Sequence, residues 1–284
     1  MTSLPSVPVR LRVHLAHAAV QSIADEVGAD ILHIKGPGVD PSLRPEGRSS
    51  IDADVLVRPS HLKRLLVGLE GRLWRRVTEL STGGLIEHST NWYHSELGQL
   101  DVHVRFPGIE LAPDQAFEVL WRNRACMQVA HRPCVVPGVM AQRVVLLLHA
   151  ARDMPSYRED VRIAWGVADD DTRAEVHGLV RELDAEVAFA VVTGRLEEFR
   201  DRPEYALWRL FADGTVATSG FGRLWAELRA VAAGGWGARV RIIGYAIGII
   251  LHMPQRLAWH LARKPTWQEV AAGYLKFLRR LVSR

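Results

Sequence analysis

The hydrophobic and polar positions of residues 48–59, RSSIDADVLVRP, alternate as they do in a strand. From residue 51 the odd positions are apolar, and successive side chains of a strand point to opposite faces. Asp52 and Asp54 would then share one face of the strand. Neighbouring carboxylates on one sheet face repel each other and raise each other's pKa. The pattern therefore predicts a compensating cation or a set of hydrogen-bond donors beside the two aspartates.

A second alternating segment, residues 99–106 (QLDVHVRF), places Asp101 and His103 on its polar face. If the two strands are neighbours in an antiparallel sheet, Asp101 converges with Asp52 and Asp54 on one patch. Three carboxylates supply the hard oxygen ligands that a pair of Mg²⁺ ions needs. The sequence leaves two interpretations of His103 open. It holds Asp101 or contacts the substrate, or it is simply a hydrogen-bonded neighbour of the carboxylates.

Other segments show strand or helix patterns that complete the predicted fold. Apolar residues at helical spacing predict a helix over residues 9–27 and another over residues 60–72, with Ser60 as the N-cap of the second. Further strands are predicted at residues 31–34, 73–80 and 85–93. From Pro113 onward the pattern is helical, with a break at residues 133–138.

This order of elements predicts an α+β protein. We expect an N-terminal domain at residues 1–137, with a mixed sheet and flanking helices, followed by an all-helical C-terminal domain at residues 138–284. The chain has 284 residues, of which 48% are apolar, and this suffices for a sizeable core.

Composition narrows the class of protein. The net charge is +4, from 36 basic and 32 acidic residues, which suits a polyanionic ligand such as a triphosphate or RNA. Cys126 and Cys134 lie in no CxxC or His/Cys cluster, so a disulfide framework and a structural zinc site are not expected. The N-terminal residues lack the pattern of a signal peptide. We therefore expect a cytoplasmic protein.

The longest apolar stretch is residues 242–254, which is shorter than the roughly 20 residues that a membrane span needs. Basic residues crowd both sides of it. Two interpretations stay open: a buried helix, or a basic amphipathic helix that contacts a membrane surface or a partner through residues 239–264.

A glycine turn follows the strand predicted at residues 31–34. At such a turn Gly36 lets backbone N–H groups approach a phosphate, while Lys35 supplies a compact positive charge. Arg48, Ser49 and Ser50 precede the aspartate strand and are candidates for further contacts to a triphosphate, although they are equally consistent with solvated loop residues. His149, on an apolar helix, is interpreted as a core histidine.

Three motifs together resemble the DNA polymerase β-like nucleotidyltransferase superfamily, in particular its branch of uncharacterised nucleotidyltransferases. They are ILHIKGPG, RSSIDADVLVRP followed by a helix, and LDVHVRF, and the resemblance covers residues 31–106. It implies that Asp52, Asp54 and Asp101 bind the catalytic metal ions, Mg²⁺ or Mn²⁺. Two departures stand out: Lys35-Gly36 replaces the usual glycine-serine or glycine-glycine turn, and Ile51 stands where a small residue is common.

The resemblance implies a metal-dependent transfer of a nucleoside monophosphate from a nucleoside triphosphate, such as ATP, to an acceptor hydroxyl, phosphate or amine, with release of pyrophosphate. The acceptor stays open among a tRNA end, a protein side chain, a small antibiotic-like alcohol and a peptide natural product. The alternative function is an inactive binding or scaffold protein of the same fold in a biosynthetic pathway. The three intact aspartates argue against that alternative.

Overall fold

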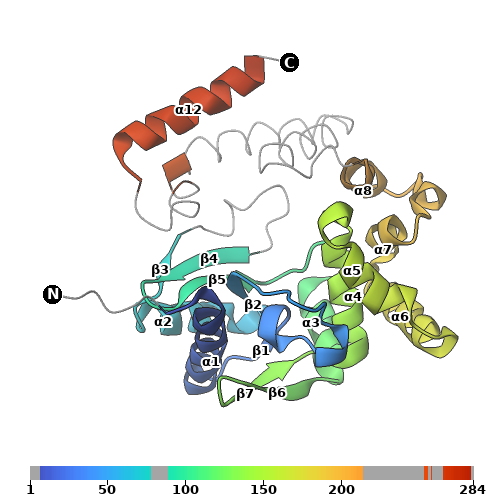
Figure 1. The fold of residues 1–284 in the computed structure, drawn as a ribbon, viewed down its shortest axis with the longest axis horizontal. Helices are drawn as coiled ribbons and strands as arrows, with labels where there is room; N and C mark the ends of the chain where they lie inside the picture. The colour runs from blue at the N-terminus through green and yellow to red at the C-terminus, as the bar shows by residue number, and fades with distance from the viewer. Residues whose placement is uncertain (1–6, 78–88, 214–252, 255–256, 258–264, 283–284) are drawn as a thin grey trace.

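The computed structural model describes residues 7–77, 89–213, 253–254, 257 and 265–282, and it combines one main sheet with many helices (Figure 1). The helices are α1 (Val9–Val27), α2 (Leu62–Glu70), α3 (Pro113–Arg122), α4 (Val139–Ala150), α5 (Arg158–Val161), α6 (Asp170–Glu182), α7 (Glu186–Val192), α8 (Tyr205–Ala212) and α12 (Trp267–Val282). The strands are β1 (Ile31–His33), β2 (Asp52–Val57), β3 (Arg75–Arg76), β4 (Ser89–His94), β5 (Gly98–His103), β6 (Ala125–Val129) and β7 (Arg132–Val136).

The main sheet is mixed, with five strands in the order β1-β2-β5-β4-β3. Strand β2 pairs with β1 in antiparallel and with β5 in parallel orientation. The expectation of antiparallel aspartate strands was therefore wrong. Helix α2 carries the chain back across the sheet after β2, and such a crossover is what parallel neighbours require. Strands β6 and β7 form a separate hairpin.

The two faces of the main sheet are covered by different helices. Ala53, Val55 and Val57 of β2 belong to a core cluster with residues of α1 and α2. Leu56 points the other way, into a second cluster that includes α3, α4, α6 and α7. Because side chains alternate along a strand, the aspartates of β2 lie on the same face as Leu56. The predicted α+β class is confirmed.

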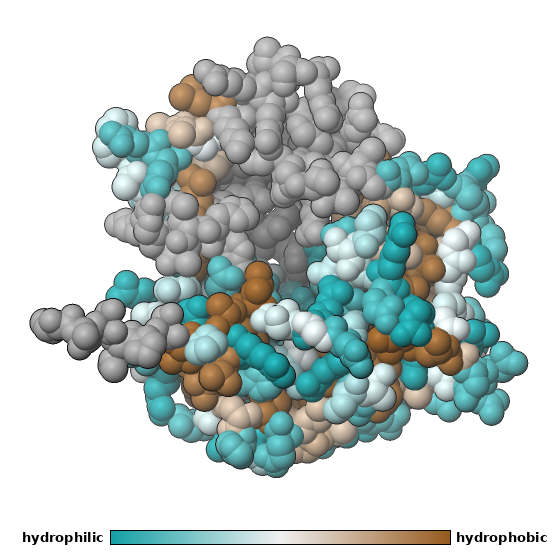
Figure 2. All heavy atoms as spheres, viewed as in Figure 1, coloured by the Kyte–Doolittle hydropathy of each residue, from teal (hydrophilic) through white to brown (hydrophobic). Residues whose placement is uncertain are grey.

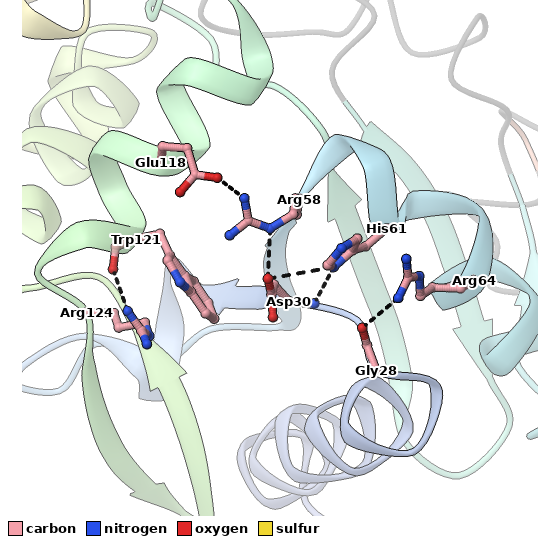
Figure 3. Close-up of polar contacts among 8 residues, drawn as sticks. All are labelled: Gly28, Asp30, Arg58, His61, Arg64, Glu118, Trp121 and Arg124. Carbon is pink, nitrogen blue, oxygen red and sulfur yellow. Dashed lines mark hydrogen bonds and ion pairs between the residues drawn. The ribbon is translucent and has the colours of Figure 1, made fainter.

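A charged network fixes the end of β2 that lies far from the aspartates (Figure 3). The Nε atom of Arg58 donates to Asp30 Oδ2 at 2.7 Å, and its guanidinium also pairs with Glu118 of α3. The same guanidinium lies 4.7 Å from the ring centroid of Phe117 and 5.7 Å from that of Trp121. One arginine thus joins the sheet to α3.

The second helix begins later than expected. Pro59 starts a 3-10 turn at Pro59–His61, and α2 follows with no side-chain cap, so the assignment of Ser60 as N-cap was wrong. The imidazole of His61 instead accepts a hydrogen bond from the backbone N–H of Asp30 at 3.0 Å (Figure 3). The proline imposes its own turn before the helix can start.

Several element boundaries also differ from the expectations. Strand β5 ends at His103 rather than at residue 106, and within residues 73–77 only Arg75–Arg76 is strand. Strand β6 was expected to be helical, but it pairs with β7 through the tight turn at Ala130 and His131, which both have positive φ. Pairing with a neighbouring strand overrides the weak local pattern there.

The helical part and the sheet share one apolar cluster. Leu32, Leu56 and Phe106 contact the same cluster as residues of α4 and α7. The division into domains at residue 137 stays a prediction. Residues 239–264 lie almost wholly outside the described part of the chain. Among the described segments, no helix combines the length and apolar character needed to cross a bilayer.

Candidate active site

Three carboxylates meet where β2 and β5 run side by side. In the parallel register Asp54 lies directly opposite Asp101, and Leu56 lies opposite His103. Asp54 is only 2% exposed, and its Oδ1 atom is 2.6 Å from Lys35 Nζ and 2.9 Å from His103 Nε2. His103 is therefore a hydrogen-bonded neighbour of Asp54, and its ring also lies near Asp101.

Hydrogen bonds orient the other two carboxylates. Ser50 Oγ donates to Asp52, with distances of 2.8 Å to its carbonyl oxygen and 3.0 Å to Oδ1. Asn91, which lies opposite Asp101 on β4, donates its amide Nδ2 to Asp101 Oδ1. Each aspartate thus has its own donor from a neighbouring element.

The pKa values show that the carboxylates of this cluster are buried and repel one another. Burial raises the pKa of Asp54, but the charge of Lys35 and the hydrogen bond with His103 outweigh it and hold that pKa well below its usual range. Burial and the charges of Asp54 and Asp52 raise the pKa of Asp101 to about 8. The pKa of Asp52 is raised by burial and by Asp54. Lys35 alone therefore does not balance the cluster.

A divalent metal ion suits this arrangement. Atoms of Asp54, Asp101 and His103 that are able to ligate a metal lie within 4.8 Å of one another. Within the part of the chain that the structure describes, this group contains His103 and not Asp52, which was expected to be a ligand together with Asp54 and Asp101. Carboxylate oxygens suit Mg²⁺ and Mn²⁺, and an imidazole nitrogen is a further ligand for transition metals. The donor set and the mutual repulsion of the carboxylates both fit such an ion.

A cavity of about 320 Å³ adjoins the carboxylates. Seven of the nine predicted site residues line it, namely Lys35, Gly36, Arg48, Ser49, Ser50, Asp52 and Asp54. Asp101 and His103 are not part of its wall. The volume is at the lower end of that of small-molecule pockets, about 300–1,000 Å³. Most of the residues predicted from the sequence thus lie together in the wall of one cavity.

The glycine turn brings the backbone close to the loop before β2. Gly36 has a φ of 61°, a left-handed conformation that favours glycine. A Cβ atom at this position would lie 3.1 Å from the Cβ of Ser50 and 3.5 Å from His17 Nε2. The turn therefore tolerates no side chain without strain, and it holds Lys35 beside the aspartates.

Three basic residues of the cavity wall were not identified from the sequence. Arg10 and His14 lie on the first turns of α1, and Arg44 follows the glycine turn. In the described part of the chain neither arginine forms an ion pair with a carboxylate. Arg44 is held by its own loop, because it donates to Val39 O at 2.6 Å and to Pro37 O at 2.7 Å.

The electrostatics of these three residues are the opposite of those of the aspartates. Burial and the charges of Arg10 and Arg44 lower the pKa of His14. The positive end of the α1 dipole adds to this potential. The spacing of Arg10 and His14, four residues apart on a predicted helix, was the available signal for a shared face. On the face shown in Figure 2, hydrophilic side chains lie between α1 and α4.

The helical part supplies the remaining wall. Arg48 donates to Asp160 Oδ2 at 2.7 Å and to Ser156 O at 3.3 Å, and its guanidinium lies 4.3 Å from the ring centroid of Tyr157. His149 is only partly buried, lines the cavity and packs edge-on against Tyr157, so it is not the core histidine that was expected. Arg48 thereby joins the loop before β2 to the helices.

Comparisons with known proteins give distant structural neighbours. No protein-family model and no curated protein matches the chain. A crystal structure of the lincosamide antibiotic adenylyltransferase LnuA with lincomycin bound is similar with 17% identity and a TM-score of 0.38, covering 55% of this chain and 96% of LnuA.

The antibiotic-resistance factor ANT(2'')-Ia is similar in two structures. Its solution structure has 16% identity and a TM-score of 0.42 over 67% of this chain and 95% of the neighbour. Its complex with adenylyl-2''-tobramycin has 17% identity and a TM-score of 0.37 over 65% and 98%. All three likenesses have at most 17% identity and a TM-score of at most 0.42, so the residues of the cavity must carry any statement about this chain's own function.

Proposed function

We propose that this protein is a metal-dependent nucleotidyltransferase, which moves a nucleoside monophosphate from a nucleoside triphosphate to an acceptor and releases pyrophosphate. The observation that carries the proposal is that one cavity is lined both by Asp52 and Asp54 of the carboxylate cluster and by basic side chains. The first suits divalent cations, and the second suits a polyphosphate. A nucleoside triphosphate with its bound ions presents both charges to one site.

Each residue is proposed to have the role that its position in the site allows. Asp52, Asp54 and Asp101, with His103, would hold one or two Mg²⁺ or Mn²⁺ ions, which when bound neutralise the phosphates and lower the pKa of the acceptor hydroxyl. Asp101 is the proposed receiver of the acceptor's proton once a bound ion holds its carboxyl in the ionised form. Positioning and charge neutralisation dominate this chemistry.

The phosphates would lie against the glycine turn and the basic wall. Gly36 and Ser50 offer close backbone approach and a hydroxyl, and Arg10 and Arg44 supply positive charge. The acceptor's oxygen forms a new bond to the α-phosphorus, while the bond from that phosphorus to the oxygen of the leaving pyrophosphate breaks. Placing positive charge beside the leaving group stabilises the charge that develops on it.

The phosphate that is transferred to the acceptor, followed by an isotopic label, tests the reaction directly. The protein is incubated with each nucleoside triphosphate, labelled on either the α- or the γ-phosphate, with Mg²⁺ or Mn²⁺ and a cell extract as the acceptor pool. Transfer of α-label to an acceptor together with release of γ-label in pyrophosphate supports the proposal. Transfer of γ-label would show a kinase instead. Lincomycin and tobramycin, which occur in the neighbours' structures, serve as defined acceptor probes.

The alternative, an inactive binding protein of this fold, makes a different forecast. It would bind nucleotide without transferring label from either position. No arrangement of the described residues favours it, because Asp52, Asp54 and Asp101 are all present and all have hydrogen-bond or ion-pair partners.

A further inference from the structure

The ammonium group of Lys35 lies within the carboxylate cluster, in contact with Asp54. Its Nζ atom lies 2.6 Å from Asp54 Oδ1, and the Lys35 side chain is 20% exposed. The charges of Asp54, Asp52 and Asp101 all act on it. Lys35 is thus the cation that the sequence pattern required beside the aspartates, and it comes from the protein itself.

This position conflicts with an ion bound to the same carboxylate. Asp54 belongs to the group that is able to hold a metal together with Asp101 and His103. Divalent ions approach carboxylate oxygens to about 2.0–2.6 Å. An ammonium and a divalent ion on one carboxylate would be two cations a few ångströms apart in a buried site, where their repulsion is strong.

We propose that Lys35 is an internal counter-ion of this cluster: it holds Asp54 while no divalent ion is bound, and it gives up that contact when an ion binds. This inference rests on the proposed function, since it takes the ion to be the one that nucleotidyl transfer uses. Lys35 is then a positioning residue. It keeps Asp54 in place for the ion and sets how tightly the ion binds.

Once it has left Asp54, the ammonium of Lys35 has room to lie elsewhere in the cavity. Lys35 lines the same cavity wall as Gly36 and Ser50, where the phosphates are proposed to lie. Lysine has four rotatable side-chain bonds, so its ammonium moves several ångströms without movement of the backbone. The positive charge displaced from Asp54 thereby becomes available to the incoming phosphates.

The affinity of the protein for the ion, measured without nucleotide, tests whether Lys35 and the ion compete for Asp54. Free Mn²⁺ is measured by electron paramagnetic resonance during titration of the protein, without nucleotide, for the wild type, Lys35→Met and Lys63→Met. Lys63 lies exposed on α2, away from the cavity, and is the matched control. Lys35→Met should bind Mn²⁺ about 10- to 100-fold more tightly than the wild type, the size of one lost charge-assisted contact.

The outcomes separate this inference from the proposed function. Equal or weaker Mn²⁺ binding by Lys35→Met, with clear binding by the wild type, overturns the counter-ion role and leaves the nucleotidyltransferase proposal standing. Absence of Mn²⁺ binding by every variant overturns both. Unchanged binding by Lys63→Met is required in either case.

Chemical labelling tests the same movement without a variant that has to fold. Lysines of the wild-type protein are acetylated briefly with and without saturating Mn²⁺, and the modified residues are quantified by mass spectrometry. The freed ammonium of Lys35 should react severalfold faster with Mn²⁺ present, while Lys63 reacts equally in both conditions. Constant or slower labelling of Lys35 contradicts its release.

Discussion

The two ends of β2 carry charged clusters that differ in their balance. At the Arg58 end, one arginine pairs with Asp30 and Glu118 and stacks against aromatic rings of α3. At the aspartate end, three carboxylates face one lysine, and the pKa of Asp101 is raised to about 8. The same strand therefore has one end where each carboxylate pairs with an arginine in contact with solvent, and one where buried carboxylates share a single lysine.

The difference between the two ends of β2 indicates which end carries a functional site. A cluster whose charges are already satisfied joins elements of the fold, and nothing further is needed to explain it. Buried carboxylates that repel one another cost stability in the free protein, so a cation that binds between them gains from removing that repulsion. Variants at the two ends of β2 should accordingly affect different properties.

The largest effect is expected for activity at the aspartate end. Asp54→Asn removes the carboxylate that contacts both Lys35 and His103, and it should lower nucleotidyl transfer by about a thousandfold, as for loss of one preorganised electrostatic contact. Label transfer from α-labelled triphosphate measures it, corrected for the folded fraction by circular dichroism. More than a tenth of wild-type activity would remove Asp54 from the chemistry.

At the other end, Arg58→Met should affect stability and not the site. The methionine keeps apolar packing on Phe117 but leaves Asp30 and Glu118 without their partner. Because Glu118 is 57% exposed, the loss is discounted to about 1–2 kcal/mol, or roughly 2–8 °C in Tm. Calorimetry measures the shift, and Mn²⁺ affinity should match that of the wild type. A changed affinity would show that the two ends are coupled.

Asp101→Asn should change how the stability of the protein depends on pH, because it removes a carboxylate that its neighbours repel. The pKa of Asp101 is raised from about 4 in the unfolded chain to about 8 in the folded protein. Between these values the folded protein holds a proton that the unfolded chain releases, so stability falls as pH rises through this window. Without metal, Asp101→Asn should therefore raise Tm clearly at pH 8 and change it very little at pH 4. A loss at pH 8 would indicate a structural role for the carboxylate.

The smallest effect is expected at the basic wall. Arg10→Gln removes one exposed charge and should weaken binding of ATP about 3- to 10-fold at low salt, with the difference shrinking at high salt. Isothermal titration measures it, and Arg75→Gln on β3, away from the cavity, is the control. Equal affinity in both variants would place the phosphates elsewhere in the cavity.

Local pattern was enough to predict the strand that carries the aspartates. Ala53, Val55 and Val57 are buried together on one face, and the faces of a strand follow from its period of two. The orientation of β5 relative to β2 was not predictable in this way, because it depends on where α2 carries the chain. A local pattern contains no information about a crossover.

The residues of the candidate site were predicted by type, and their contacts were not. The aspartates and the Lys35-Gly36 turn were found from the sequence, yet the pairing of Lys35 with Asp54 joins residues of two separate segments. Arg44 was missed because its role depends on carbonyl groups of its own loop that orient it. Such contacts exist only once the backbone has folded.

The parallel pairing of β2 with β5 also determines at what stage of folding the site forms. Asp54 and Asp101 lie opposite each other although α2, β3 and β4 intervene in the chain. Contacts across such a long loop form late, because the entropy of closing the loop must be overcome first. During synthesis the carboxylates therefore stay apart until β5 has emerged and docked beside β2.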